Sequence, residues 1–449
     1  MMNRTELKRR SFLHATSAGA AGLSLATPRL LRAAEGDMLA VKGGTPVRTE
    51  PFHGWPVLEE ADLTPWREVL EKKAWSRYYG SGYVSQFEKE YAQAMGVKDC
   101  LAVTNGTNAL LCALDALDVG PGDEVLVPPY TFVATVNVVL MRFAVPVFVD
   151  TDRNTFQMDP AKIEEKITSR TRCIIPVHFG GNSVELDQIL AIAKKHNLYV
   201  IEDACQSHLA EWREKKVGTW GDLGCFSFQV TKNLSSGEGG AVISDNTDLM
   251  DRCIEFHNNG SGRKRYPGIR YNRNGINQRM TEFQGAILLQ GLKRLEAQAA
   301  KRDENGAYLT EQLNAIPGIR VMEMYEGCTR NAYHVYSFRF DRQAFAGISK
   351  DAFLQALNAE GIPAAGGYSR LNKEPFWENT LRSRPFQAIY SPVTIDRYVA
   401  ENECLENDRL CEEAAWLSQQ ILLGTQKDMD DIATAVRKVH KNAELLAKA

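Results

Sequence analysis

A single lysine, Lys232, lies in the segment SFQVTKNLSSGEGGAV (residues 227–242), between a short apolar stretch and a glycine-rich turn. Two interpretations are open. Isolated lysines are usually solvated loop residues, whereas a lysine held beside a carbonyl group can form a covalent Schiff base. Taken alone, the segment favours the solvated lysine. The covalent interpretation requires further groups elsewhere in the chain.

A lysine that binds an aldehyde cofactor requires three kinds of partner. A carboxylate must keep the pyridine nitrogen protonated, a helix N-terminus must hold a phosphate, and a flat side chain must cover the ring. The candidates are Asp203 in IEDACQSH, Gly106 and Thr107 in VTNGTNALLCAL, and Phe132 in PPYTFVAT, with Ser227 five residues before the lysine. Each has an ordinary alternative: a helix cap for the first three, a core aromatic for Phe132 and a strand serine for Ser227.

The elements that must position these residues alternate between strands and helices. Apolar strand patterns cover 124–129, 146–150, 173–179, 198–204, 223–228 and 240–245, and helical patterns cover 108–120, 132–144 and 185–197. This order predicts an α/β fold with a large, doubly wound, mostly parallel sheet. Such sheets bind ligands at the carboxyl ends of their strands. Asp203 ends one predicted strand and Lys232 follows another, so we expect both at that edge.

A long helical pattern over 281–313 leads out of this domain. The segments beyond it, which include AYHVYSFRF and a closing helix, predict a smaller C-terminal α+β domain. We therefore divide the chain into a signal segment (1–35), a large α/β domain with its entry segment (36–300) and a small domain (301–449).

The first 35 residues differ from the rest of the chain. Arg9 and Arg10 precede a weakly apolar run from Phe12 to Ala26, which is too short for a stable transmembrane span. This pattern resembles a twin-arginine signal and predicts export to the periplasm or cell envelope. The alternative is a disordered basic extension, in which case the protein stays cytoplasmic.

Composition narrows the function classes further. The 449 residues carry a net charge of −3 with both signs mixed, and this balance predicts no nucleic-acid partner. The nine cysteines are scattered, without the spacing of a disulfide framework or a zinc site. Cys205 and His208 have no second pair, so we expect no metal.

The motifs, in this order, resemble the DegT/DnrJ/EryC1/StrS family of pyridoxal-phosphate-dependent aminotransferases, which act on keto-sugars and keto-cyclitols. The resemblance covers roughly residues 40 to 445 and rests on five segments, namely YYGSGYVSQFEKEYAQAMGVKDCLAVTNGTNAL, VPPYTFVATVN, VIEDACQSHLA, CFSFQVTKNLSSGEGGAV and GINQRMTEFQGAI. It implies a type I aminotransferase-like fold and pyridoxal 5'-phosphate as cofactor. It also implies an amino-acid donor, glutamate or glutamine, and a keto-sugar or keto-cyclitol acceptor.

The resemblance also implies a role for each matching residue. Lys232 matches the Schiff-base lysine and Asp203 the partner of the pyridine nitrogen, and these are the predicted catalytic residues. The other matches bind the cofactor: Gly106, Thr107 and Ser227 contact its phosphate, Phe132 stacks on its ring, and Gln206 contacts the ring hydroxyl. Asn277 matches an asparagine that reaches the phosphate of the neighbouring subunit, which implies a homodimer with shared active sites.

The chain departs from the family pattern at two positions. Asn105 stands where the family often has Ser, and Leu209 stands where it often has Gly. Family members that act as dehydratases carry His in place of the lysine, so Lys232 argues against that branch. FSFQ and GEGGA are most similar to members that act on inosose-like cyclitols or cyclic ketones.

Two other functions compete with the aminotransferase. An exported protein that keeps the fold and only binds a sugar would suit the signal, but it would not need both the lysine and the aspartate. A nicotinamide-dependent sugar oxidoreductase would need a G-x-G-x-x-G turn after its first strand. The corresponding turn here, TNGTNA, does not have that pattern.

Overall fold

The computed structural model describes residues 38–79, 82–263 and 268–447, so the predicted signal segment (1–35) lies outside the described residues. In the part that is described, no helix is both long and apolar enough to cross a membrane. All nine cysteines are described, and each is a free thiol.

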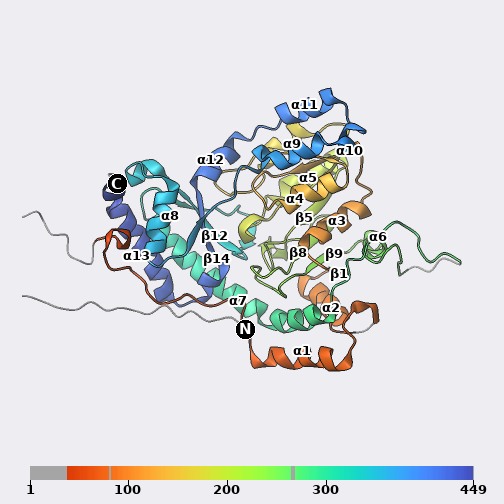
Figure 1. Cartoon of the computed structure of the whole chain (residues 1–449), viewed down its shortest axis with the longest axis horizontal. Coiled ribbons are helices and arrows are strands. Elements are labelled where there is room, and N and C mark those ends of the chain that lie inside the picture. The colour runs from red at the N-terminus through yellow and green to blue at the C-terminus, as the bar shows by residue number, and fades with distance from the viewer. Residues whose placement is uncertain (1–37, 80–81, 264–267, 448–449) are drawn as a thin grey trace, which may run out of the picture.

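A seven-stranded sheet forms the centre of the larger part of the molecule (Figure 1). Strand β9 is antiparallel to both of its neighbours, and every other neighbouring pair is parallel. The predicted α/β fold with a mostly parallel sheet is therefore confirmed. The strands lie in the order β1 (Asp99–Val103), β9 (Gly240–Ser244), β8 (Leu223–Ser227), β5 (Tyr199–Asp203), β4 (Thr171–Ile174), β2 (Glu124–Val127) and β3 (Val145–Phe148).

Helices cover both faces of this sheet, because successive strand side chains point to opposite faces. In β1, Leu101 and Val103 join one core, whereas Cys100 and Ala102 join the other. The first core is closed by α3 (Gly106–Ala116), α4 (Ala134–Met141) and α6 (Thr247–His257). The second is closed by α2 (Tyr83–Met95), α5 (Leu186–His196) and α7 (Glu282–Asn314), with α1 (Glu60–Lys72) packed outside α7.

Several predicted elements are shorter than expected, and two of them have a clear local reason. The helix predicted over 132–144 ends at Met141, because Phe143 adopts a left-handed backbone with φ 58°. The strand predicted over 173–179 ends at Ile174, two residues before Pro176, which has no backbone N–H to donate to a ladder.

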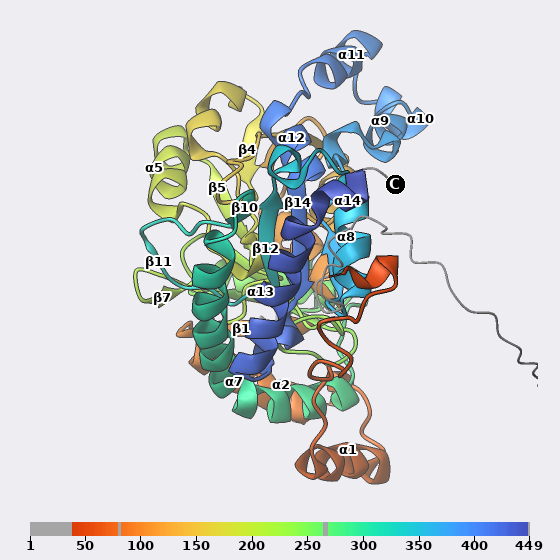
Figure 2. The same cartoon turned by 90° about the vertical axis from the view of Figure 1, so that its left-hand side faces the viewer.

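The smaller part of the molecule is built on an antiparallel four-stranded sheet, which Figure 2 shows beside α8 and α13. Its strands lie in the order β10 (Ile319–Val321), β12 (Val335–Phe340), β14 (Ala414–Ser418) and β13 (Ala364–Gly366). Helices α8 (Lys350–Ala359) and α13 (Gln426–Lys441) bury their apolar residues against it, and α14 (Ala443–Ala447) follows α13.

Packing does not follow the predicted division of the chain at residue 300. Helix α7 runs unbroken across that position. The first part of the entry segment, residues 39–52, is predicted to belong to the large domain but joins the small core, where the Glu360 carboxylate accepts hydrogen bonds from the Ala40 and Val47 amides at 2.8 and 3.0 Å. Trp377 and Phe386, which follow residue 300, pack into the large core.

The remaining elements are short. Four helices lead from β13 back to β14, and a small three-stranded sheet lies at the edge of the molecule. The helices are α9 (Pro375–Leu381), α10 (Arg384–Gln387), α11 (Pro392–Ala400) and α12 (Leu405–Glu413), and the small sheet has the order β11 (Cys328–Arg330), β6 (Glu211–Trp212) and β7 (Lys215–Lys216).

Candidate active site

A cavity of about 430 Å³ lies where β1, β5 and β8 end, at the edge of the sheet that the sequence predicted. The tertiary structure brings seven of the eight predicted site residues into its wall. These are Gly106, Thr107, Phe132, Asp203, Gln206, Ser227 and Lys232.

Lys232 lies in the loop after β8, and its side chain is half-buried in the cavity wall. The amine is 3.5 Å from Nε2 of His334, which comes from the smaller part of the molecule. Burial lowers the pKa of Lys232 below its ordinary value, while Cys205 and Asp203 partly offset this effect. A lowered pKa increases the fraction of neutral amine, which is the form that attacks a carbonyl group.

Asp203 is the last residue of β5, and only 4% of its surface is exposed. Its two carboxylate oxygens accept hydrogen bonds from the Thr135 hydroxyl at 2.9 Å and from the Cys205 amide at 3.2 Å. Thr135 is itself bonded to Thr131 at 3.0 Å. These bonds fix a carboxylate in the cavity opposite the lysine loop.

The N-terminus of α3 forms a cradle in the wall of the same cavity. The Asn105 side chain caps the helix by accepting a hydrogen bond from the Asn108 amide at 2.8 Å. A Cβ atom at Gly106 would come within 2.8 Å of the Ser227 Cβ and 2.9 Å of the Cys205 Sγ. Glycine therefore leaves room at a helix N-terminus, where amides and the Thr107 hydroxyl suit a phosphate. The residues present fit the phosphate of the implied cofactor.

Phe132 and Gln206 line the same cavity from different loops. Phe132 is 56% exposed, so its alternative interpretation as a core aromatic is wrong. Gln206 is buried, and its amide oxygen accepts from the Gly180 amide at 2.9 Å. Its amide nitrogen donates to the Tyr368 hydroxyl at 3.3 Å.

Asn277 is the predicted site residue that lies outside the cavity of its own chain. It is exposed, forms an isolated antiparallel bridge with Asn258, and accepts a hydrogen bond from the Arg279 amide at 3.3 Å. An exposed position is compatible with a contact to a second subunit, which stays a prediction.

The wall residues that sequence reasoning missed include Thr135, His334 and Tyr368, which contact predicted site residues. Thr135 could have been found, because it follows Phe132 by three residues at the start of a predicted helix. His334 and Tyr368 come from the far end of the chain, and only tertiary packing brings them to the lysine.

A second cavity of about 420 Å³ adjoins the first and shares Gln206, Thr231, His334 and Tyr368 with it. We call it the aromatic cavity, because its other walls include the rings of Trp55, Phe179 and Trp416. Among the described residues that line it, none is Lys, Arg, Asp or Glu.

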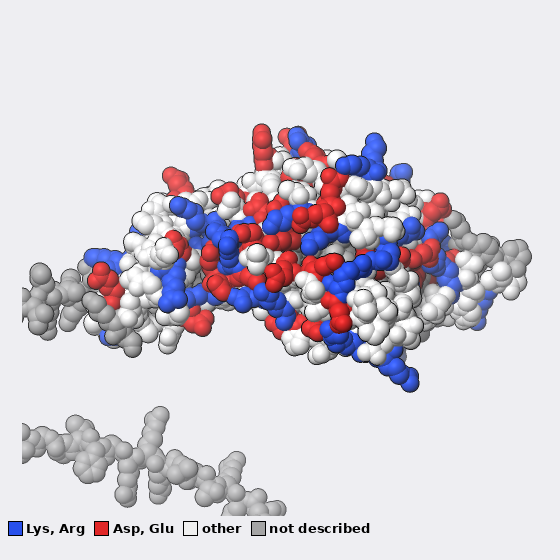
Figure 3. Space-filling model, turned by 90° about the horizontal axis from the view of Figure 1, so that it is seen from above, with Lys and Arg blue, Asp and Glu red and all other residues white. Residues whose placement is uncertain are grey.

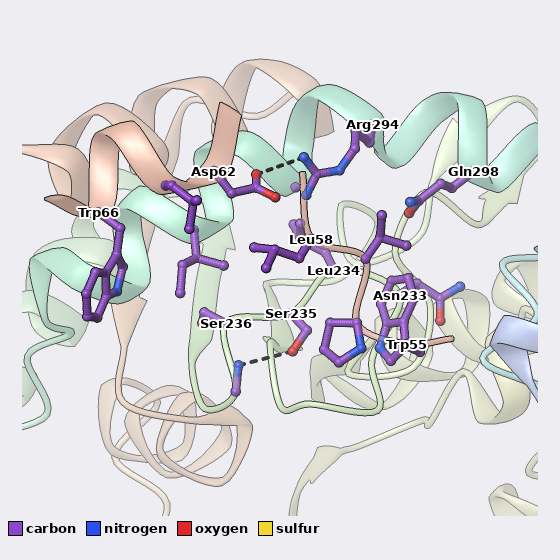
Figure 4. A pocket seen from close by; sticks show the side chains of 16 residues that line it. Trp55, Leu58, Asp62, Trp66, Asn233, Leu234, Ser235, Ser236, Arg294 and Gln298 are labelled. Carbon is purple, nitrogen blue, oxygen red and sulfur yellow. Dashed lines mark hydrogen bonds and ion pairs between the residues drawn. The ribbon is translucent and has the colours of Figure 1, made fainter. Parts of the chain in front are cut away.

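A third cavity of about 460 Å³ lies beneath α1 and α7, on the other side of the loop that follows Lys232 (Figure 4). Arg294 of α7 pairs with Asp62 of α1 at 2.8 Å at its edge. Its walls are largely apolar, and it contains none of the predicted site residues.

Comparison with known proteins places this geometry among aminotransferases. A family model described as the DegT/DnrJ/EryC1/StrS aminotransferase family matches residues 56–437. The L-glutamine:2-deoxy-scyllo-inosose aminotransferase of Streptoalloteichus tenebrarius is 34% identical over 417 residues, which cover 89% of this chain and 97% of the relative.

Two solved structures are similar over most of the chain. The crystal structure of 3-amino-5-hydroxybenzoic acid (AHBA) synthase has a TM-score of 0.76 and 30% identity, with coverage of 90% of this chain and 100% of that one. The structure of NtdA from Bacillus subtilis with bound cofactor PMP has a TM-score of 0.71 and 26% identity, with coverage of 88% and 87%.

Proposed function

The chain belongs to the DegT/DnrJ/EryC1/StrS aminotransferase family, and we propose that it uses pyridoxal 5'-phosphate to move an amino group from glutamine or glutamate to a keto-cyclitol or keto-sugar. The observation that carries this proposal is the meeting of Lys232, Asp203 and the N-terminus of α3 in one cavity. When bound, the cofactor supplies an aldehyde that condenses with an amine and a pyridinium ring that withdraws electrons.

Each residue of the cavity has a separate role toward the cofactor. Lys232 would hold the cofactor through its amine, and the free amine would move a proton to or from the substrate carbon. Asp203 would hold a proton on the ring nitrogen through its negative charge, with its carboxylate oriented by Thr135 and the Cys205 amide. The N-terminus of α3, with Thr107, binds the phosphate.

Three further side chains complete the cofactor site. Ser227 adds a hydroxyl beside Gly106 for the phosphate. Phe132 covers one face of the ring, and its exposure leaves that ring surface free to stack. Gln206, held by Gly180 and Tyr368, contacts the ring hydroxyl.

The aromatic cavity supports an acceptor that carries no nucleotide. A nucleotide diphosphate is normally bound by Arg or Lys, and neither lines this cavity among the described residues. Aromatic rings with a few amide and hydroxyl groups suit an uncharged polyhydroxylated ring. The relative from S. tenebrarius, whose name specifies L-glutamine and 2-deoxy-scyllo-inosose, supports glutamine as donor and a free keto-cyclitol as the preferred acceptor.

Two parts of the proposal concern the molecule as a whole. The protein acts as a homodimer in which Asn277 reaches the phosphate site of the second subunit, and the exposed position of Asn277 supports this.

The protein is also exported by the twin-arginine route, as the Arg9–Arg10 segment suggests. Replacing both arginines with lysine should leave the protein in the cytoplasm. If the unaltered protein is itself found only in the cytoplasm, the export proposal fails.

Two measurements test the proposed chemistry. The purified protein should bind pyridoxal phosphate with a visible absorbance that borohydride treatment fixes onto Lys232, and Lys232→Ala should fold but lose this absorbance. Glutamine alone should convert the bound cofactor, and a keto-cyclitol alone should restore it, as ping-pong kinetics require. Conversion by the donor without restoration by any keto-cyclitol or keto-sugar would refute the acceptor class and leave the cofactor assignment intact.

A further inference from the structure

Arg302 is a buried cation without an acidic partner. It lies on α7 with 0% of its surface exposed, and among the described residues it pairs with no carboxylate. Burial lowers the pKa of its guanidinium to about 9, so it remains charged at neutral pH. The Trp55 ring lies 5.5 Å from the guanidinium carbon. Burying an unpaired charge lowers the stability of the folded protein. This cost indicates that Arg302 has a functional role.

The guanidinium holds one particular side chain. Its Nε and Nη2 donate to the amide oxygen of Gln419 at 2.9 and 2.5 Å. Because arginine has donors only, the oxygen of the Gln419 amide must face Arg302 and the amide nitrogen must face away. That nitrogen is buried and has no hydrogen-bond partner in the described protein, and Gln419 lines the aromatic cavity.

Two further side chains have polar atoms without partners in the part of the chain that the structure describes: Arg302, which binds Gln419, and His334, which lines the same cavity. Arg302 Nη1 and His334 Nδ1 are both buried and unpaired within the described residues. Buried polar atoms are nearly always hydrogen-bonded, so the unpartnered nitrogen of Gln419, in a residue that lines the cavity, is a candidate group for binding a ligand. The same cavity reaches the chemistry, because Nε2 of His334 in its wall lies 3.5 Å from the Lys232 amine.

We propose that the Gln419 amide nitrogen binds the carboxylate of the amino-acid donor, with Arg302 as the positioning residue. This inference rests on the proposed function. The amide turns its positive end away from Arg302, in a residue that lines the aromatic cavity, and so extends the influence of the buried guanidinium to a ligand there. A carboxylate supplies the negative charge that Arg302 lacks, which a neutral hydroxyl does not.

Gln419→Glu is the most direct test, because it keeps the shape of the side chain. The new carboxylate pairs with Arg302, removes the N–H donor and repels a donor carboxylate. With glutamine alone, the affinity measured from conversion of the bound cofactor should fall about tenfold or more. In the second half-reaction, the affinity for an uncharged keto-cyclitol should change by less than about twofold, since no charge is lost or repelled there.

A second readout does not depend on activity. Cofactor-free Gln419→Glu should unfold at a higher temperature than the unaltered protein, because its buried guanidinium gains a counter-ion. A lower unfolding temperature would contradict an uncompensated charge at Arg302 and overturn the inference. Arg302→Met provides an independent variant: it removes the buried charge, frees Gln419 to rotate, and should also weaken glutamine binding.

Gln298→Glu is the matched control. Gln298 lies one turn before Arg302 on α7 and lines the third cavity instead of the aromatic one (Figure 4). It adds the same charge near the guanidinium, and the affinity for glutamine should stay within about twofold of the unaltered protein. An equal loss in this control would show a general charge effect and overturn the inference.

The remaining outcomes separate this inference from the proposed function. If Gln419→Glu weakens the keto-cyclitol and not glutamine, Gln419 binds the acceptor and the inference is wrong. If it binds glutamine as well as the unaltered protein does, the inference fails while the aminotransferase stands. If the unaltered protein reacts with no amino acid, the proposed function itself fails.

Discussion

At the Lys232 amine, burial and nearby acidic groups act in opposite directions. Burial lowers its pKa, and Cys205 and Asp203 raise it by a smaller amount. In the cofactor-free protein the folded state therefore holds this proton less tightly than the unfolded chain, whose lysine has an ordinary pKa of 10.5. A protonated Lys232 costs stability below its folded pKa, and this cost disappears as the pH rises toward 10.5.

Lys232→Met should consequently stabilise the cofactor-free protein at neutral pH. The difference in unfolding temperature between the variant and the unaltered protein should shrink as the pH rises, because the unaltered lysine becomes neutral in both states. Thermal unfolding across a pH series measures this. A difference that stays constant with pH would show that the gain comes from packing and not from the charge.

The negative charge of Asp203 is expected to affect turnover more than it affects the stability of the fold. Asp203→Asn keeps the shape of the side chain and its bond from Thr135, but it cannot hold a proton on the ring nitrogen. Transaminase turnover should fall by orders of magnitude while the cofactor still binds. Absorbance titration and steady-state rates on the same preparation would check this, and near-normal turnover would rule out the assigned role.

At the scale of elements, β5 carries two adjacent carboxylates with separate functions, because neighbouring strand residues face opposite ways. Asp203 faces the cavity. Glu202 is fully buried and accepts hydrogen bonds from His178 Nε2 at 2.9 Å and from the amides of Gly218, Trp220 and Gly221 at 2.6–2.7 Å. It thereby fastens the end of β5 to the loop that precedes β8.

Burial alone raises the pKa of Glu202, but the hydrogen bonds from His178 and the backbone amides outweigh it and lower the pKa below 4.5. Its stabilising effect is therefore complete above pH 4.5 and is lost as the pH falls through the lowered folded pKa. Glu202→Gln should cost about 3 kcal/mol at neutral pH, since an amide nitrogen cannot accept these bonds. Denaturant unfolding measures the free energy of unfolding of both proteins. The difference between the variant and the unaltered protein should become smaller in acid. A difference that does not change with pH would contradict this account.

At the scale of the whole molecule, the active site depends on parts that are far apart in the sequence. Helix α7 extends from the second core of the large sheet into the small core, and it carries both Arg302 and the contacts to α1. Seen from above, Lys and Arg side chains are mixed with Asp and Glu side chains over the surface (Figure 3). This face therefore carries no concentrated charge of one sign.

The proposed dimer gives a test at this scale. Lys232→Ala and Asn277→Ala chains should each be inactive or weak, and mixing them should restore activity, because one site of each mixed dimer regains both residues. Activity after confirmed subunit exchange measures this. Two copies of Lys232→Ala, mixed in the same way, are the control and should stay inactive. No recovery in the mixed pair would indicate self-contained sites.

The sequence by itself determined the local parts of this protein. Alternating apolar segments predicted the α/β fold and its sheet edge, because helix and strand periodicities are local properties. The motifs around Lys232, Asp203 and Gly106 predicted the cavity, since the carboxyl ends of parallel strands meet at one edge. Their catalytic roles remain predictions.

Only the tertiary structure decided which distant residues join that cavity. His334, Tyr368 and Gln419 lie more than a hundred residues after the lysine, in loops and a short 3-10 helix, and no sequence pattern marks them as site residues. The same holds for residues 39–52 of the entry segment, which pack on the small core. A sequence pattern specifies which side of an element is apolar, but the choice between two apolar cores depends on how the whole chain packs.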